Sequence, residues 1–562
     1  MESEVEPARF YLVQPFLMAE PRIPFPHNIH HMSKSADKQS LSKSFKDDRL
    51  TKSVAFTLYI AARSLQQSQW DGFKQLLLHF DVNQRGEIMA EYRTKWIGAK
   101  SDSLLVHFIR PEGWSLEPSH KSFYPEDQPS LTPYTPINSF YFALPTRMVN
   151  IDFFAAQRWI DTESQLAKYD LSSSCAAPVS IEELSSLAEG EQDRNPPLPA
   201  SILTMPLGYG EAYQGSKRLR TTIANLYSIK IPTPLPVDNV LITPGASLAN
   251  LVVFHALCSL GDHVIVQYPT YQQLYSLPKS IGVEVTLWKS KEKDKWQLDL
   301  EELKDLIKPN TKMIVLTNPA NPTGAIIPRS QLQAIVEIAK EHSIIVFSDE
   351  IFRPLFHSIT PVDPEFPPSA LSLGYENVLV SGSLSKCYSL PGIRVGWLAS
   401  RNSDYIASCL NYRSYSTISM SHLDEAVASF ALDGKCIHSL LQRNMGLAKQ
   451  NIASVESFIE QHRWACDWVR PVAGTIGFIK FSKMGKPVDD VEFCRRLQDK
   501  KGVLLVPGSY GFGNREDFKG YIRIGYAMKP EIMEAGLEAL REFMEEEFEN
   551  VPLAGTNKLA LR

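Results

Sequence analysis

The sequence predicts an α/β protein with a mostly parallel central sheet in a large domain, together with a smaller α+β domain. Two observations lead to this prediction. Between residues 239 and 400, short apolar segments alternate with segments whose apolar residues have helical spacing, a pattern typical of βαβ units. The composition also changes near Met148, and the residues before it predict a poorly ordered N-terminal extension.

The N-terminal extension, residues 1–147, is expected to be partly helical and partly disordered. Residues 32–53 are rich in serine and lysine, and residues 111–145 contain seven prolines. Between them, the stretch 51–80 has the apolar spacing of a helix. One interpretation is that the extension is an upstream segment included in the gene model in error, so a chain starting at Met148 is predicted to fold.

Residues 73–92 resemble one EF-hand, because an apolar helix is followed by the loop-like sequence DVNQRGEI. The fifth loop position is Arg85 and the twelfth is Tyr92, where a calcium loop has an oxygen ligand and a bidentate glutamate. We therefore expect an ordinary Asx turn between helices and no calcium site.

The remaining chain divides into three predicted parts. Residues 148–196 are the N-terminal part of the small domain, 197–401 the large domain, and 402–562 the C-terminal part of the small domain. Amphipathic helices are predicted at 149–169 and 215–230. The predicted strands of the large domain are 239–245, 262–269, 312–319, 344–350, 377–383 and 394–400. Longer helices follow residue 402, with apolar strand-like segments at 475–481 and 521–527.

The composition argues against several classes of protein. A formal net charge of −5 is not that of a nucleic-acid binder that depends on bulk positive charge. No apolar run approaches membrane-spanning length, and the acidic start MESEVEPARF lacks the features of a signal peptide. The seven cysteines are scattered without CxxC pairs, which predicts reduced thiols, no metal site and a cytoplasmic location.

Polar residues follow several predicted strands, and in open α/β sheets ligands bind beyond the carboxyl ends of the strands. These residues supply an amine, a carboxylate, an amide, an aromatic ring and a phosphate cradle. In that order they are Lys386, Asp349, Asn321, Tyr271, and the group Gly245, Ala246, Ser247, Ser383 and Arg394. Together an amine, a buried acid and an anion site indicate a phosphorylated aldehyde held as a Schiff base, which is pyridoxal 5'-phosphate (PLP). The alternative for Lys386 is a side chain that merely extends to solvent.

From about Met148 to the C-terminus, the chain resembles the class I/II aminotransferase family of PLP enzymes, which has fold type I. The resemblance is carried by five motifs in the family order. These are TPGASLAN, YPTY, TNPANPTGA, SDEIFRP and SLSKCYSLPGIRVGW. The resemblance implies a homodimer that acts on an amino acid and a keto acid, with no nucleic-acid or membrane partner.

The resemblance also implies a role for each matching residue. Lys386 would form the internal aldimine and carry the proton, and Asp349 would pair with the pyridinium nitrogen. Asn321 would bind the phenolic oxygen, and Tyr271 would stack on the ring. The phosphate would be bound by Ser383, Arg394 and the turn of Gly245, Ala246 and Ser247 at a helix start. Arg523 would clamp the substrate α-carboxylate, and Tyr209 would reach the cofactor phosphate of the partner subunit.

The chain departs from the family pattern at two positions. The family usually has a tyrosine three residues after the cofactor aspartate, and this chain has Phe352. Without that hydroxyl donor, we expect a raised aldimine pKa, and the choice of reaction is left open at this position. In addition, Tyr209 lies six residues before Gly215, where five are expected.

Two alternative functions follow from the sequence. Residues 152–184 resemble the entry segment of capreomycidine-synthase-like enzymes, which predicts elimination, replacement or cyclisation on the same scaffold. A PLP-sensing transcription regulator would instead have an N-terminal helix-turn-helix with a basic recognition helix. Residues 54–100 do not contain that pattern. The sequence therefore favours a PLP-dependent aminotransferase.

Overall fold

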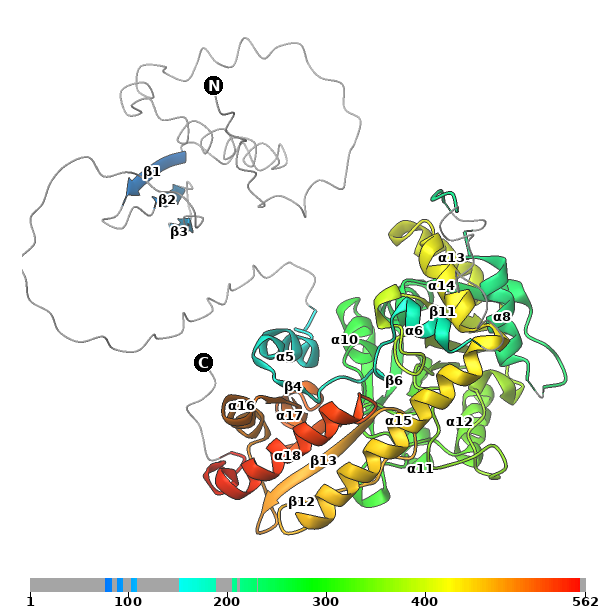
Figure 1. The fold of residues 1–562 in the computed structure, drawn as a ribbon. Coiled ribbons are helices and arrows are strands. Elements are labelled where there is room, and N and C mark those ends of the chain that lie inside the picture. Colours follow the sequence, from blue (N-terminus) through cyan, green and yellow to red (C-terminus); the bar gives the residue numbers. More distant parts are fainter. Residues whose placement is uncertain are drawn as a thin grey trace, which may run out of the picture. The chain divides into compact units, whose positions relative to one another are not determined.

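The computed structural model describes residues 151–188, 205–209, 213–229 and 231–555, together with the backbone of three strands between residues 76 and 108. The chain divides into two compact units, Met1–Asn138 and Ser139–Arg562. Figure 1 labels the elements of both units.

The first unit contains an antiparallel sheet in the order β1-β2-β3. Its strands are β1 (Leu76–Val82), β2 (Ile88–Thr94) and β3 (Ser103–Phe108). The helix predicted over 51–80 is therefore wrong from Leu76 onward, because residues 78–82 alternate apolar and polar types and pair with β2. The turn at 83–87 consequently connects strands rather than helices. Its conformation, and the predicted helical residues before Leu76, lie outside the described residues.

The second unit is built on a seven-stranded sheet in the order β5-β11-β10-β9-β8-β6-β7. The strands are β5 (Val240–Thr243), β6 (His263–Tyr268), β7 (Glu284–Lys289), β8 (Thr311–Thr317), β9 (Ile345–Asp349), β10 (Val378–Ser383) and β11 (Gly396–Ser400). The six predicted strands and the mostly parallel sheet are confirmed. Strand β7 was not predicted, because this edge strand mixes three polar with three apolar residues and only Trp288 is buried.

The direction of β11 decides which residues gather at one edge of this sheet. β11 runs antiparallel to both β10 and β5, whereas the other neighbouring strands are parallel. The start of β11 therefore lies at the same edge as the carboxyl ends of β5, β6, β8, β9 and β10. Most residues of these strands are buried on both faces, as expected for a sheet covered on each side.

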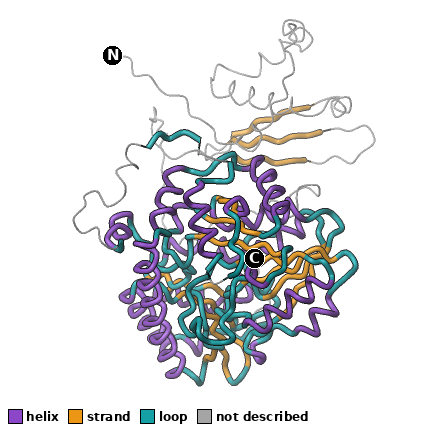
Figure 2. The backbone as a smooth tube through the Cα atoms, turned by 90° about the vertical axis from the view of Figure 1, so that its right-hand side faces the viewer, coloured by secondary structure: helices purple, strands orange, loops and turns teal. Residues whose placement is uncertain are grey.

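Helices surround this sheet, and Figure 2 shows the strands inside the unit with the helices around them. The helices of this region are α8 (Lys217–Tyr227), α9 (Gly245–Leu257), α10 (Gln273–Ser280), α11 (Leu300–Leu306), α12 (Arg329–Glu341) and α13 (Ser403–Ser416). Short 3₁₀ turns lie at η2 (Val237–Asn239), η3 (Glu292–Asp294), η4 (Ala370–Leu373) and η5 (Pro391–Ile393). In α12, Leu332, Ile335, Val336 and Ala339 form the buried stripe of an amphipathic helix.

A second, smaller sheet has the order β12-β13-β17-β16, with β14 paired to β13. Its strands are β12 (Cys466–Trp468), β13 (Ile476–Lys483), β14 (Lys486–Pro487), β16 (Val506–Pro507) and β17 (Tyr521–Gly525). The segment before the large sheet joins this region, because β4 (Tyr169–Asp170) pairs with β15 (Val503–Leu504). The predicted strands at 475–481 and 521–527 therefore form neighbours in one sheet.

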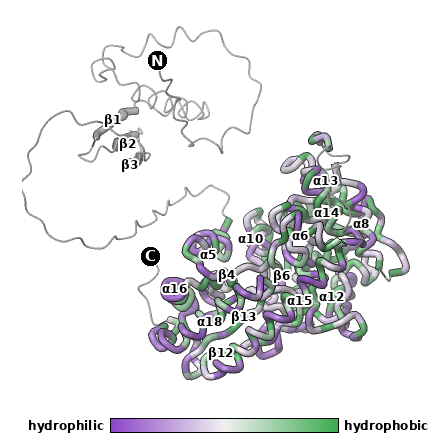
Figure 3. Tube along the Cα trace, in the orientation of Figure 1, coloured by the Kyte–Doolittle hydropathy of each residue, from purple (hydrophilic) through white to green (hydrophobic). Residues whose placement is uncertain are grey.

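The helices of this smaller region come from both ends of the second unit. They are α5 (Ala155–Glu163) with η1 (Ser164–Leu166), α6 (Ile181–Ser186), α14 (His422–Ala431), α15 (Gly434–Gln461), α16 (Asp490–Lys501), α17 (Gly508–Gly511) and α18 (Pro530–Glu546) with η6 (Phe548–Asn550). The long helix α15 packs along α18 (Figure 1). Figure 3 shows hydrophilic and hydrophobic residues mixed along α18, which buries Met533, Leu537 and Leu540 on one face.

Among the described residues, no helix is both long and apolar enough to cross a membrane. All seven cysteines are free, and six of them are buried.

Candidate active site

A cavity of about 310 Å³ opens at the carboxyl edge of the large sheet, between that sheet, α5 and the smaller sheet. All of the predicted site residues line it except Gly245 and Tyr209. Lys386 follows β10, Asp349 ends β9, Asn321 follows β8 and Tyr271 follows β6. Because β11 is antiparallel, Arg394 at its start reaches the same edge. Arg523 enters from the middle of β17 in the smaller sheet.

Lys386 is half-buried, and its amine is held by the segment before α6. Its Nζ donates a hydrogen bond of 2.7 Å to Ser174 Oγ and lies 3.6 Å from Cys175 Sγ. The sequence reasoning did not identify Ser174 and Cys175. They lie more than 200 positions from Lys386, and a short serine-rich run carries no signal that would pair it with a lysine.

Asp349 is 1% exposed and has no cation paired with it among the described residues. The backbone N–H of Ile351 donates to its Oδ1 at 3.2 Å. Burial raises the pKa of Asp349 from 3.8 to about 6, and the neighbouring Asn250 and Ser381 partly offset that rise. Asn250, on α9, also has a buried Oδ1 without a hydrogen-bond partner. Asn250 is a second lining residue that the sequence reasoning missed.

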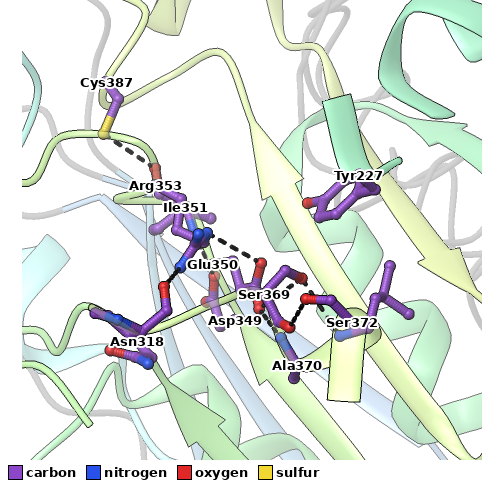
Figure 4. A network of polar contacts seen from close by, with 12 residues as sticks. Tyr227, Asn318, Asp349, Glu350, Ile351, Arg353, Ser369, Ala370, Ser372 and Cys387 are labelled. Carbon is purple, nitrogen blue, oxygen red and sulfur yellow. Dashed lines mark hydrogen bonds and ion pairs between the residues drawn. The ribbon is translucent and has the colours of Figure 1, made fainter. Parts of the chain in front are cut away.

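The residue after Asp349 has a structural task and lies outside the cavity lining. Glu350 Oε1 accepts hydrogen bonds from Ser369 Oγ at 3.1 Å and from the N–H of Ala370 at 2.9 Å, and Arg353 lies 3.6 Å from its other oxygen. Figure 4 shows this network beside Asp349. Glu350 thus anchors η4 and fixes the loop that ends β9.

The start of α9 forms a cradle of backbone donors. Ala246 and Ser247 are in its first turn, where N–H groups have no partner within the helix. Gly245 has φ +74°, and a Cβ there would lie 2.5 Å from Arg394 Nη2, so the guanidinium group lies directly against this turn. Arg394 also donates to Ser385 Oγ at 3.2 Å, and Ser385 N donates to Ser383 Oγ at 3.1 Å. Gly245 forms the backbone of this turn and is not one of the residues that line the cavity.

Arg523 is a buried cation, 4% exposed, without an ion-pair partner among the described residues. Its Nη2 donates to the carbonyl oxygen of Ser172 at 2.8 Å and its Nη1 to Asn321 Oδ1 at 3.4 Å. Its Nε has no hydrogen-bond partner, and burial lowers its pKa to about 10. The guanidinium group lies 5.3 Å from the ring centre of Phe512. A buried guanidinium with a free N–H is suited to bind an anion that enters the cavity.

Three further predicted positions differ in their surroundings. Tyr271 lines the cavity, and its ring meets that of Phe154 edge-on at 4.9 Å between ring centres. Tyr209 is 82% exposed and lies outside the cavity lining. Phe352 is 1% exposed and packs beside Gly474, where an added Cβ would lie 3.4 Å from its ring.

These residues fit PLP. The cradle at α9 with Arg394 suits a phosphate, the unpaired buried Asp349 suits a protonated ring nitrogen, and Lys386 offers an amine to an aldehyde. Arg523 remains free to bind a carboxylate at the other side of the cavity. The fold and the site are therefore those of a PLP enzyme of fold type I.

Comparison with known proteins gives the family. The model of aminotransferase class I and II matches residues 207–540. Capreomycidine synthase of Streptomyces vinaceus is 30% identical over 330 residues, which cover 58% of this chain and 79% of that protein. Nicotianamine aminotransferase A of Hordeum vulgare is 26% identical over 340 residues, covering 58% of this chain and 71% of that protein.

Among solved structures, a PLP-dependent aminotransferase of Streptococcus suis is similar with a TM-score of 0.63 and 35% identity, covering 70% of this chain and 98% of that one. The chain belongs to the class I and II aminotransferase family. It is a PLP-dependent aminotransferase, and its substrates are an amino acid and a keto acid.

Proposed function

We propose that Lys386 and Asp349 are the catalytic residues of this aminotransferase, and that Arg523 binds the substrate α-carboxylate. The observation that carries the proposal is the shared cavity, into which the Lys386 amine, the buried Asp349 and the buried Arg523 all open. Two buried charges without ion-pair partners among the described residues, in a cavity lining that also holds an amine, support a role in catalysis or binding.

The residues proposed to hold PLP come from the carboxyl edge of the large sheet. They are Lys386, Asp349, Asn321, Tyr271, Gly245, Ala246, Ser247, Ser383 and Arg394. When bound, PLP supplies an aldehyde carbon that joins to an amine, and a ring that accepts the electron pair released at the substrate Cα. Asp349, ionised near neutral pH, would favour a proton on the ring nitrogen, and Tyr271 would pack against the ring.

The chain's own groups then act on the substrate. Arg523 would bind the α-carboxylate and orient the Cα–H bond towards Lys386. Lys386 Nζ, once free, takes the proton that leaves the substrate Cα. Ser174 holds that amine at 2.7 Å, so Lys386 stays beside the substrate instead of turning to solvent.

A single-turnover experiment tests these roles. The purified holoenzyme is mixed with a panel of amino acids, and both the cofactor and the released product are identified. We expect pyridoxamine phosphate and a keto acid from the native protein, and neither from a Lys386→Ala variant whose circular dichroism matches that of the native protein. A Lys386→Ala variant that transaminates at the native rate would contradict the proposal.

Elimination, replacement or cyclisation is the second candidate. It is supported by the 30% identity to capreomycidine synthase and by Phe352, which cannot donate to the phenolic oxygen. Retained PLP together with an eliminated, substituted or cyclised product in the same experiment would favour this candidate.

We also propose a homodimer in the cytoplasm. Tyr209, largely exposed in one chain, would reach the cofactor phosphate of the partner subunit. The seven free thiols are typical of a reducing compartment. Light scattering that gives the mass of one chain would contradict the dimer.

A further inference from the structure

Cys175 differs from the other six cysteines, because it is only half-buried and lines the cavity of the candidate active site. The other six are buried and lie outside the cavity lining. The Cys175 sulfur lies 3.6 Å from the Lys386 amine, and the N–H of Cys175 donates to Ser173 Oγ at 3.3 Å. A half-buried thiol in the lining of a cavity is open to small reagents that enter it. The mechanism proposed above does not use this thiol.

The segment that carries Cys175 runs between two cationic side chains of the cavity. Before Cys175, the carbonyl oxygen of Ser172 accepts a hydrogen bond of 2.8 Å from Arg523 Nη2. After it, the N–H of Ala176 donates to the carbonyl oxygen of Lys386 at 3.1 Å. From Ser172 to Cys175 the chain advances three residues, which span at most about 10 Å. One small molecule can therefore contact both the Arg523 guanidinium and the Cys175 thiol.

Arg523 provides a buried positive charge beside this thiol. It is 4% exposed, it lines the cavity, and its Nε has no hydrogen-bond partner among the described residues. Burial lowers the pKa of Arg523 to about 10, and Cys175, Asp170 and Tyr271 partly offset that decrease. The thiol is thus an electrostatic neighbour of the guanidinium group. A buried guanidinium attracts a carboxylate and would hold it close to the sulfur atom.

From this arrangement we propose that Cys175 is a site of covalent modification by electrophiles that carry a carboxylate, and that the modification inactivates the enzyme. The inference rests on the proposed function, because it takes Arg523 as a residue that binds a carboxylate. With a haloacetate, a bond forms between Cys175 Sγ and the methylene carbon while the carbon–halogen bond breaks. The halide leaves with the electron pair of that bond, and the thiol proton is released to water. The thioether formed then occupies the space between Lys386 and Arg523.

Alkylation of the full-length holoenzyme tests this proposal. Iodoacetate and iodoacetamide are compared, because they differ in charge but hardly in size, and peptide mass spectrometry measures the rate of labelling at each cysteine. We expect Cys175 to be labelled first, and iodoacetate to react there about fivefold or more faster than iodoacetamide. Equal rates, or a faster reaction with iodoacetamide, would overturn the proposal. A Cys175 that neither reagent labels would overturn it as well.

A substitution tests the anchor. Arg523→Gln removes the positive charge, so the preference for iodoacetate at Cys175 should disappear while iodoacetamide still labels this residue. Arg541→Gln on α18 is the matched control and should keep the preference, because Arg541 pairs with Glu538 and lies outside the cavity lining. A folded Arg523→Gln protein with the native preference would contradict the proposal.

Competition on the native protein decides the matter if Arg523→Gln does not fold. An excess of acetate should slow the labelling of Cys175 by iodoacetate about threefold or more, because acetate competes for Arg523. The same concentration of acetamide, which is neutral, should have no such effect. Equal protection by acetate and acetamide, or none by either, would overturn the proposal.

Inactivation separates this proposal from the proposed function. The half-reaction of each protein is measured before and after treatment with iodoacetate. We expect the native protein and Cys258→Ser to lose about tenfold or more of their own rate, and Cys175→Ser to lose little. Cys258 directly follows α9 and lies outside the cavity lining, so it is the matched control. A Cys175→Ser protein that is inactivated as fast as the native one would contradict the proposal.

An untreated holoenzyme without any half-reaction would count against the proposed function alone. The ratio of the two labelling rates at Cys175 is measured by mass and does not depend on turnover. That ratio would still support or overturn the modification site.

Discussion

At the scale of single residues, the site contains charged side chains that are held by hydrogen bonds but have no opposite charge beside them among the described residues. The Lys386 amine rests on Ser174, whereas Asp349 and Arg523 are buried without an opposite charge among the described residues. Burial of such groups costs free energy in the protein without its ligands. This cost is recovered when the cofactor and the substrate supply the missing charges.

Ser174→Ala should slow the proton transfer that we assign to Lys386. Removing the hydroxyl at 2.7 Å frees the amine to turn away, and the loss of about 1 kcal/mol corresponds to a fall of roughly fivefold in kcat. Cofactor affinity and KM should change little. Stopped-flow half-reactions across a pH series measure this, with Ser186→Ala on the exposed face of α6 as control. An unchanged rate and pH profile would assign Ser174 no role in positioning.

Cofactor binding should weaken as the pH falls through about 6. In the cofactor-free protein the pKa of Asp349 is about 6, so below that pH the carboxyl group is neutral and no longer favours a protonated ring nitrogen. Titration of the cofactor-free protein with PLP at pH 5 and pH 8 checks this. Asp349→Asn should bind PLP weakly at both pH values and remove the pH dependence. A variant that keeps the native pH dependence would contradict this account.

Asp349→Asn should also stabilise the cofactor-free protein at neutral pH. The folded pKa of about 6 exceeds the unfolded value of 3.8, so the native state loses stability as the pH rises between these values. A pKa difference of about two corresponds to about 3 kcal/mol in the free energy of unfolding at pH 7.5, and this gain in stability of the variant should vanish below pH 4. Urea unfolding of the native protein and the variant at pH 7.5 and below pH 4 measures this difference in the free energy of unfolding.

Asp490→Asn is the matched control for this experiment. Asp490 is also buried with a pKa of about 6, but each of its two oxygens accepts a backbone hydrogen bond, from Ser509 and Gly520, whereas Asp349 accepts one backbone hydrogen bond, from Ile351. Its amide can accept only one of these bonds, so this variant should be less stable than the native protein at pH 7.5. Equal changes in the free energy of unfolding for the two variants would mean that burial of the carboxyl group alone sets the effect, and that the hydrogen bonds contribute nothing.

At the scale of elements, the cradle depends on close contact between the start of α9 and the start of β11. A Cβ on Gly396 would lie 2.6 Å from the carbonyl carbon of Gly245 and 2.7 Å from Ala246 N. Only glycine lets the two backbones approach in this way. The antiparallel β11 therefore does two things at once: it brings Arg394 to the site and it supports the turn that faces the phosphate.

Gly396→Ala should separate these two elements. We expect a loss of about 2 kcal/mol in stability and a PLP affinity lower by tenfold or more, because the turn at Ala246 and Ser247 must move. Gly392→Ala is the control, since a Cβ at Gly392 meets no atom within 4 Å. Thermal unfolding and PLP titration of both variants measure the effect. Equal behaviour of the two variants would show that the contact is not needed.

At the scale of the whole molecule, the site joins two sheets of the second unit. The large sheet brings Asp349, Asn321 and Lys386, and the smaller sheet brings Arg523. The first compact unit of the chain is Met1–Asn138.

A chain that begins at Met148 should therefore fold and bind PLP. We expect the affinity for PLP and the rate of the half-reaction to equal those of the full-length protein within about twofold, since every described lining residue is retained. Absorbance titration and single-turnover rates measure this. Insoluble protein, or soluble protein without PLP, would show that the second unit needs residues 1–147.

Most strands of the large domain could be predicted from local sequence patterns, whereas little of the rest of the chain could. Inner strands such as β8 and β9 are continuous apolar runs that end in polar residues, so both the strand and its ligand-facing end are visible in one short segment. β7 was not predicted, because an edge strand with polar residues lacks a continuous apolar run. β1 was taken for a helix because three successive leucines fit either period.

By itself, the sequence determined the residues that follow each strand, because the side chain at a strand end is fixed by the chain order. It thereby determined the cofactor class and the family. Only the tertiary structure decided the partners of these residues: Ser174 with Lys386, Asn250 with Asp349, and Phe512 with Arg523. These contacts join segments far apart in the chain, and their geometry depends on how the two sheets and α5 pack, which no local pattern contains.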